Sequence, residues 1–196
     1  MSDRLDPQRD FITIVSGLPR SGTSLMLQML AAGGMPVLSD GVRPADDDNP
    51  HGYFEWEQVK SLKQDASWVP AAVGKAVKAI YWFLQDFPAG HTYRVIFLRR
   101  NLDEVLLSQA KMLERRGTRE TSRDDRRMKL LFEQELREID AWLAQQSAMT
   151  TLNVDYQAVL NAPAEQAARV DRFLGGGLNV AAMAAAVDPG LYRSRR

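Results

Sequence analysis

The sequence contains no cysteine, which excludes a disulfide framework, a thiolate zinc site and a cysteine nucleophile. It also has no excess of charge of either sign, since 25 lysine and arginine residues balance 25 aspartate and glutamate residues. A neutral chain has no overall field that draws it to nucleic acid or to an acidic membrane, so we expect neither partner. It has no apolar run near the roughly 18 residues of a membrane span. Its first residues lack the apolar centre of a signal peptide, so we expect a cytoplasmic protein.

The pattern of apolar residues predicts one α/β domain over residues 1–196, with a polar lead-in at 1–10 and a basic tail at 188–196. Apolar runs at 11–15, 93–98 and 151–154 predict buried strands. Helical patterns follow at 25–30, 102–117, 122–147 (with Ser122 as N-cap), 163–174 and 180–187. Segment 54–68 has a weaker helical pattern, and strand and helix compete over 75–84. This alternation predicts a mainly parallel central sheet with helices on both faces.

A glycine-bearing loop connects the first predicted strand to the first predicted helix. Residues 17–24 read G-x-x-x-x-G-T-S, and two glycines five apart let the backbone curl so that several N–H groups point into one concavity. The following helix adds its own N-terminal N–H groups and the positive end of its dipole. We therefore predict an anion site for phosphate or sulfate here, in preference to a plain turn.

This loop differs from the phosphate loop of ATP- and GTP-dependent enzymes. Thr23 occupies the position at which such a loop carries lysine, and the basic residue is Arg20, which follows Pro19 inside the loop. In addition, the strand at 93–98 ends in Leu98 and not in an aspartate. Both missing residues serve Mg²⁺-dependent phosphoryl transfer. The sequence thus counts against a nucleotide kinase, which stays the first alternative.

The loop resembles the donor-binding loop of the sulfotransferase family, in which proline, a basic residue, Ser or Thr, Gly, Thr and Ser or Thr follow one another. Residues 19–24 match this pattern. The resemblance implies a three-layer P-loop NTPase-like fold, the nucleotide PAPS (3′-phosphoadenylyl sulfate) as sulfuryl donor, PAP as product, and no metal requirement. It also implies a set of donor-binding residues in the loop: Gly17, Pro19, Arg20, Ser21, Gly22, Thr23 and Ser24.

The family resemblance predicts a second donor-binding segment, in which arginine follows a buried strand and serine stands eight residues later. Arg100 and Ser108 match at this spacing, and Asp103 matches an acidic position between them. The resemblance implies that Arg100 and Ser108 hold the 3′-phosphate of the donor. An arginine at the carboxyl end of a strand lies where α/β proteins bind ligands, and its planar fork suits phosphate oxygens. The alternative is a surface arginine and a buried helical serine.

Weaker likenesses extend the resemblance over most of the chain. Residues 152–156 resemble the family's strand ending in Tyr-Glu, although the order and the acid differ. Residues 163–175 resemble the helix and the Phe-Leu-Gly sequence that follow in the family. The basic tail, which contains Arg193, either closes over the donor or is a frayed, solvated end.

For catalysis we expect Arg20 to neutralise the bridging oxygen and the departing phosphate of the donor. The family uses histidine or glutamate as the base, and residues 49–57 are the place to look for it. Glu55 is the first candidate, because it follows a Gly-Tyr-Phe turn that resembles the acceptor-side segment of bacterial members. His51 is the second, since its ordinary pKa near ~6.5 suits proton transfer, and Glu57 is the third. For each of them a solvated loop side chain is the alternative.

The sequence does not identify the acceptor, which we expect to offer a hydroxyl or an amine. Lys75 and Lys78 either project toward the donor or acceptor or face solvent. A second alternative to the transferase is a non-catalytic protein that binds PAP or PAPS, with an acceptor site that is incomplete or completed by a second subunit in a homo-oligomer.

Overall fold

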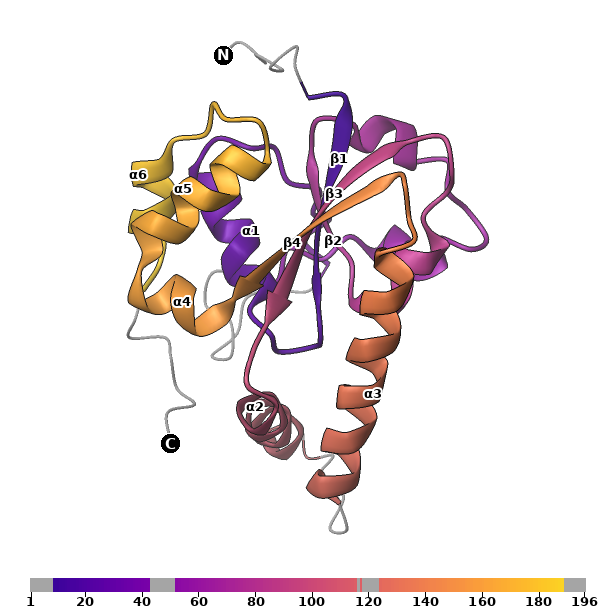
Figure 1. Ribbon diagram of the computed structural model, residues 1–196, viewed down its shortest axis with the longest axis vertical. Coiled ribbons are helices and arrows are strands. Elements are labelled where there is room, and N and C mark those ends of the chain that lie inside the picture. The colour runs from indigo at the N-terminus through magenta and orange to yellow at the C-terminus, as the bar shows by residue number, and fades with distance from the viewer. Residues whose placement is uncertain (1–8, 43–51, 116, 118–123, 189–196) are drawn as a thin grey trace.

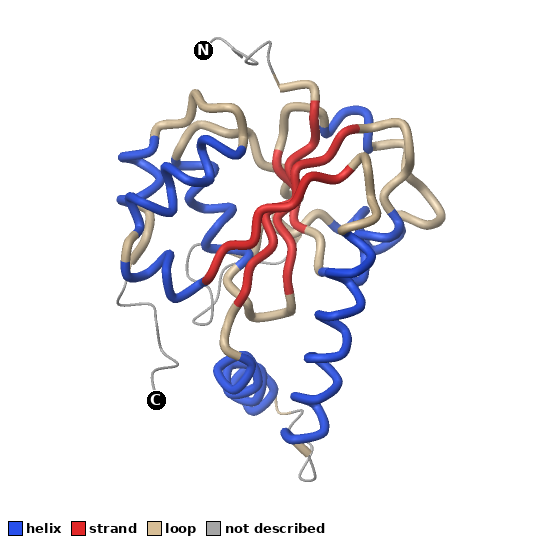
Figure 2. The backbone as a smooth tube through the Cα atoms, in the orientation of Figure 1, coloured by secondary structure: helices blue, strands red, loops and turns tan. Residues whose placement is uncertain are grey.

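Four parallel strands form a sheet at the centre of the protein (Figure 1, Figure 2). The computed structural model describes residues 9–42, 52–115, 117 and 124–188. The strands lie in the spatial order β2-β1-β3-β4, and all three neighbouring pairs are parallel. Their bounds are β1 (Phe11–Gly17), β2 (Ala76–Lys78), β3 (Thr92–Arg99) and β4 (Met149–Asp155). The predicted α/β fold with a mainly parallel sheet is confirmed.

Helices cover both faces of the sheet. On one face lie α1 (Thr23–Ala32), α4 (Tyr156–Asn161), α5 (Pro163–Phe173) and α6 (Val180–Ala185), while α3 (Asp125–Leu143) lies on the other (Figure 1). Helix α2 (Leu102–Arg115) follows β3 at the foot of the view. The described residues also form three short 3₁₀ helices: η1 (Glu57–Ser61), η2 (Val69–Ala72) and η3 (Tyr81–Asp86). None of the helices in the described part of the chain has the length and apolar character needed to cross a lipid bilayer.

Side chains of the strands alternate between two apolar clusters, one on each face. On β1, Phe11 and Val15 pack in the cluster that contains residues of α1, α5 and α6. Ile12 and Ile14 pack in the opposite cluster, with residues of the 3₁₀ helices and α3. Successive strand residues point to opposite faces, so a sheet covered on both faces buries every residue of β1. This double burial explains the uninterrupted apolar run by which the strand is predicted.

Two predicted helices differ from those in the structure. The helix predicted at 122–147 spans Asp125–Leu143, and Asp124 caps it, since a carboxylate oxygen of Asp124 accepts a hydrogen bond of 3.1 Å from the backbone N–H of Arg127. The predicted cap, Ser122, lies outside the described residues. Segment 54–68 contains the 3₁₀ helix η1 and turns, without an α-helix. Its buried residues Val59 and Leu62 are three apart, which is the period of a 3₁₀ helix.

The ambiguous segment 75–84 contains both types of structure in succession. Strand β2 takes three residues at the edge of the sheet, and Ile80 is extended before η3 begins. A strand this short carries too little pattern to be separated from the turn that follows it. Helix α4, which begins directly after β4, is not among the predicted elements.

The carboxyl ends of the strands meet at one edge of the sheet. The pairing register places Val15 beside Lys78 and Arg99 beside Asp155. The loop at Gly17, the end of β2, the residue after β3 and the start of α4 therefore leave the sheet at the same edge. In open α/β sheets this is the edge at which ligands bind.

Candidate donor-binding site

The loop after β1 curls through three residues with positive φ. These are Gly17 (+146°), Arg20 (+71°) and Gly22 (+103°), the last of which is the N-cap of α1. The backbone N–H of Ser21 donates to the carbonyl of Leu18 at 3.1 Å and closes the turn. A side-chain-bearing residue in the left-handed region costs of order 1–3 kcal/mol and persists only where its surroundings hold it. The strain thus lies at Arg20, the residue predicted to face the departing phosphate.

Close approaches of other atoms require glycine at two loop positions. A Cβ at Gly22 would overlap Cδ2 of the Tyr156 ring and would lie 2.7 Å from Cε2. A Cβ at Gly17 would lie 2.5 Å from Oγ of Ser21 and 2.8 Å from the carbonyl of Leu98. The two glycines therefore allow the loop to pack directly against β3 and α4.

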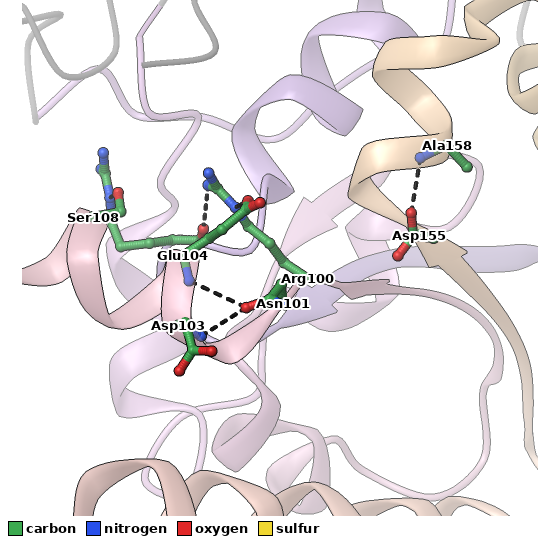
Figure 3. A network of polar contacts seen from close by, with 8 residues as sticks. Arg100, Asn101, Asp103, Glu104, Ser108, Asp155 and Ala158 are labelled. Carbon is green, nitrogen blue, oxygen red and sulfur yellow. Dashed lines mark hydrogen bonds and ion pairs between the residues drawn. The ribbon is translucent and has the colours of Figure 1, made fainter. Parts of the chain in front are cut away.

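Arg100 and Ser108 both form a hydrogen bond with Arg20, at the centre of the loop. They are the two residues of the predicted second donor-binding segment. Nη1 of Arg100 donates to the carbonyl oxygen of Arg20 at 3.0 Å. Nε of Arg20 donates to Oγ of Ser108 at 3.0 Å. Figure 3 shows Arg100 just before α2 and Ser108 further along that helix. The two segments that were predicted separately from the sequence lie side by side at one edge of the sheet.

Glu104, the residue after Asp103, is an acidic residue that contacts Arg100. Oε2 of Glu104 lies 3.0 Å from Nε of Arg100, and both side chains are largely buried. Asp103 instead forms an ion pair with Lys129 of α3 at 2.9 Å. The side chain of Asn101 begins the helix by accepting from the backbone N–H groups of Asp103 and Glu104 (Figure 3). Arg100 thus pairs with a carboxylate four residues further along the chain, in the first turn of α2.

Tyr156 packs between the loop and Arg100. The guanidinium carbon of Arg100 lies 4.3 Å from the centroid of the Tyr156 ring, and the ring borders Gly22 on another side. Asp155 fixes the start of α4, because its carboxylate accepts from the backbone N–H of Ala158 at 2.8 Å (Figure 3). Burial raises the pKa of the Tyr156 hydroxyl, so the ring is a neutral platform on which the guanidinium stacks.

Lys78 brings a third cation to the same edge of the sheet. Its Nζ donates to Oγ of Ser24 at 3.2 Å and to the carbonyl of Tyr53 at 3.0 Å. A carboxylate oxygen of Glu55 lies 3.8 Å from the same Nζ. The Lys78 side chain is 10% exposed, so it is not the solvent-facing residue that the sequence allowed. Lys78 connects the first turn of α1 with the segment that carries the predicted base.

The backbone around Glu55 is held in an unusual conformation. Phe54 has a φ of +50°, and Tyr53 is buried, with its carbonyl bound by Lys78 and by Oγ of Ser24. On the other side, the backbone N–H of Asp40 donates to the carbonyl of Glu55 at 3.1 Å. The segment is thus fixed on both sides of Glu55, and strained backbone of this kind concentrates at functional sites.

Asp40 fastens this segment to the edge of the sheet. Its two carboxylate oxygens accept from the backbone N–H groups of Glu57 at 2.6 Å and Val42 at 3.0 Å. These hydrogen bonds lower the pKa of Asp40. Two residues earlier, Leu38 pairs through its backbone N–H with the carbonyl of Ala76 in β2. No sequence pattern points to Asp40, because its partners are backbone groups.

The other predicted residues of the loop lie at or beside the curled backbone. Pro19 is partly exposed, whereas Ser21 and Thr23 are buried. Oγ of Ser21 has no hydrogen-bond partner within the part of the chain that the structure describes. A buried hydroxyl of this kind is costly to leave unpaired, and it lies in the loop predicted to hold an anion.

Glu57, His51 and Arg193 are the remaining predicted site residues, and the structure describes only the first of them. Glu57 forms an exposed ion pair of 2.6 Å with Lys60, so its carboxylate is engaged away from Lys78. His51 and Arg193 lie outside the described residues. Their proposed roles therefore stay predictions.

Comparison with known proteins identifies the family. The sequence model of the sulfotransferase domain family matches residues 10–188. A comparison with curated protein sequences gave no match.

Solved structures show the same fold at low sequence identity. One is a sulfotransferase domain from the curacin biosynthetic pathway, with 15% identity and a TM-score of 0.50 over 95% of this chain and 78% of that one. Another is the sulfotransferase domain of the Synechococcus PCC 7002 olefin synthase, with 16% identity and a TM-score of 0.50 over 92% and 85%. Retinol dehydratase in complex with androsterone and PAP is 15% identical, with a TM-score of 0.51 over 92% of this chain and 64% of that one. Because the family match covers nearly the whole sequence, this chain belongs to the sulfotransferase domain family.

Proposed function

We propose that this protein transfers a sulfuryl group from PAPS to a hydroxyl or amine of an acceptor. The observation that carries the proposal is the pair of hydrogen bonds that join Arg20 to Arg100 and Ser108. A donor with anionic groups at both ends needs cations at two places with a fixed separation. Cations held in this way position the donor before the reaction, and such positioning is a main source of catalysis. Family membership supports the donor, and one structural relative, retinol dehydratase, was crystallised with PAP.

The proposed donor contacts divide between the two segments. The N–H groups of the loop and of the first turn of α1, together with Arg20, Thr23 and Ser24, hold the 5′-phosphosulfate. Arg100 and Ser108 hold the 3′-phosphate. Arg193, from the tail, is proposed as a further donor contact.

Lys78 is proposed as a second cation at the 5′ end of the donor, beside Arg20. Its hydrogen bond to Oγ of Ser24 supports this assignment, because Ser24 belongs to the first turn of α1. Two cations at a site where negative charge develops lower the barrier more than one, since their field is fixed before the reaction begins.

In the proposed step, an oxygen or nitrogen of the acceptor forms a bond to the donor's sulfur while the bond from sulfur to the bridging oxygen breaks. The electron pair of the broken bond stays on the 5′-phosphate of PAP, and the acceptor's proton passes to a base. Glu55 is the proposed base, because its carboxylate lies 3.8 Å from Nζ of Lys78. Glu57 is less suitable, since it pairs with the exposed Lys60, and His51 is the alternative base.

The first experiment is thermal stabilisation by PAP, compared with Mg-ATP, Mg-GTP and free phosphate. A ligand at a hundredfold over its Kd adds about 2.7 kcal/mol to the stability of the protein that binds it. We expect PAP to raise the Tm of the wild type and of Arg99→Ala, but not of Arg100→Ala. Arg99 is the matched control, because its guanidinium contacts Asp140 and Asn153 instead of the loop. Stabilisation by Mg-ATP or Mg-GTP alone would replace the proposal with a kinase.

A further inference from the structure

Arg100 has a counter-ion of its own within the site. The Arg100 side chain is 8% exposed and that of Glu104 is 20% exposed, and the Nε to Oε2 distance is 3.0 Å. Tyr156 covers one side of the guanidinium, and the carbonyl of Arg20 binds Nη1. The guanidinium is thus fixed in one orientation, with a carboxylate at its Nε edge.

A carboxylate in this place affects any phosphate that binds to Arg100. A largely buried cation is costly without a nearby negative charge, and Glu104 supplies that charge. A phosphate that arrives at the guanidinium competes for the same cation and is repelled by Glu104. Because the pair is largely removed from water, this repulsion is screened less than it would be at the surface.

We propose that Glu104 is a specificity-determining residue, which sets how strongly the site favours a nucleotide with a 3′-phosphate over one without it. The inference rests on the proposed function, in which Arg100 holds the 3′-phosphate. Glu104 stabilises Arg100 when no phosphate is bound and reduces the gain from binding one. The preference for PAP over 5′-AMP, which differs from it only in the 3′-phosphate, is therefore smaller than Arg100 alone would give.

Glu104→Gln separates the charge from the shape of this residue. Glutamine retains an oxygen that can accept from Nε of Arg100, so the guanidinium keeps its orientation while the negative charge is lost. We expect the variant to bind PAP about tenfold more tightly and 5′-AMP with unchanged affinity. We also expect a lower Tm without ligand, because Arg100 loses its counter-ion. A purely structural role would lower the Tm and weaken PAP binding together.

Asp103→Asn is the matched control. It removes one negative charge from the same turn of α2, so the net charge of the protein changes equally. Asp103 forms its ion pair with Lys129 of α3, at 2.9 Å. We expect it to leave the ratio of the 5′-AMP dissociation constant to the PAP dissociation constant as in the wild type.

Isothermal titration calorimetry with PAP and with 5′-AMP measures this ratio for the wild type and both variants. A ratio that rises about tenfold in Glu104→Gln alone supports the inference. An unchanged or smaller ratio in Glu104→Gln, or an equal rise in Asp103→Asn, overturns the inference and leaves the proposed function intact. A wild type that binds PAP no better than 5′-AMP overturns both.

Discussion

Arg20 and Ser108 are joined by a hydrogen bond of 3.0 Å from Nε to Oγ, although 88 positions separate them in the sequence. Arg100 adds a bond of 3.0 Å to the carbonyl of Arg20. Arg20, which has a left-handed φ of +71°, is therefore held at its carbonyl by Arg100 and at its guanidinium by Ser108. The family resemblance assigns these two residues to a different part of the donor. The geometry of the loop depends on the segment after β3.

Ser108→Ala is expected to weaken PAP binding by about tenfold, because a hydrogen bond to a charged group is lost and Arg20 is no longer oriented. Ser108→Thr keeps the hydroxyl and should bind PAP nearly as the wild type does. Titration calorimetry measures both affinities. In a double-mutant cycle with Arg20→Lys, the two losses should be less than additive, since either change breaks the same bond. Fully additive losses would mean that the two residues act independently.

Gly22→Ala is expected to cost about 3 kcal/mol of stability and to abolish the PAP response. The added Cβ would overlap the Tyr156 ring, and the residue would be strained at a φ of +103°. Gly34→Ala is the control, because Gly34 has a φ of +93° but no atom within 4 Å of the added Cβ. It should cost only about 1 kcal/mol for the backbone. Equal costs in urea denaturation would show that the Tyr156 contact does not matter.

The strands, the loop after β1 and the spacing of Arg100 and Ser108 were predictable because each is a local pattern. The apolar runs of β1 and β3 reflect burial on both faces, and the glycines of the loop stand at fixed offsets from a strand and a helix. The residues that complete the site are not local. Lys78 ends a strand of three residues, which carries too little pattern to be recognised.

The contacts of Glu104 with Arg100 and of Tyr156 with the loop could not be predicted from the sequence either, for two different reasons. Asp103 and Glu104 are adjacent acids in the first turn of α2, and the sequence alone does not say that Glu104 pairs with Arg100 and Asp103 with Lys129. Tyr156 follows a strand that is far from Gly22 in the sequence, so its contact with the loop appears only when β4 takes its place beside β3.

Lys78→Met is expected to raise the Kd for PAP by about tenfold, because methionine fills a similar volume but removes the charge beside Ser24. Lys75→Met is the control. Lys75 precedes β2 and Lys78 ends it, so the two lysines lie at opposite ends of this strand. Loss of PAP affinity in both variants, or in neither, would contradict the placing of Lys78 in the donor site.

Asp40→Ala is expected to loosen the segment at 52–57. The carboxylate accepts from the backbone N–H groups of Glu57 and Val42, and these bonds hold the pKa of Asp40 below its ordinary value of 3.8. Amide hydrogen exchange at Glu57 should be about fivefold faster in the variant, as expected from one lost hydrogen bond.

The lowered pKa of Asp40 also fixes the direction of a pH effect. A carboxylate with a depressed pKa in the folded protein contributes stability that is fully present above about pH 3.8 and is lost as pH falls through the folded-state value. The Tm difference between the wild type and Asp40→Ala should therefore be constant from neutral pH to about pH 5 and should close below pH 4. A difference that persists at pH 2 would show that Asp40 acts through packing and not through its charge.

Glu55→Gln tests the base separately from the donor site. Glutamine has nearly the same shape but cannot take the acceptor's proton, so turnover should fall by about 10² to 10⁴. The Kd for PAP should change far less than turnover, because Glu55 lies 3.8 Å from Nζ of Lys78, a longer ion pair than the 3.0 Å between Glu104 and Arg100. Turnover is measured by transfer of labelled sulfate from PAPS to a panel of phenols, alcohols and amines.

Glu57→Gln is the control, since Glu57 pairs with the exposed Lys60, and it should retain activity. Full activity in Glu55→Gln would remove Glu55 as the base and direct the same test to His51. Tight PAP binding with no turnover by the wild type over the whole panel would instead favour a protein that binds the nucleotide without catalysis.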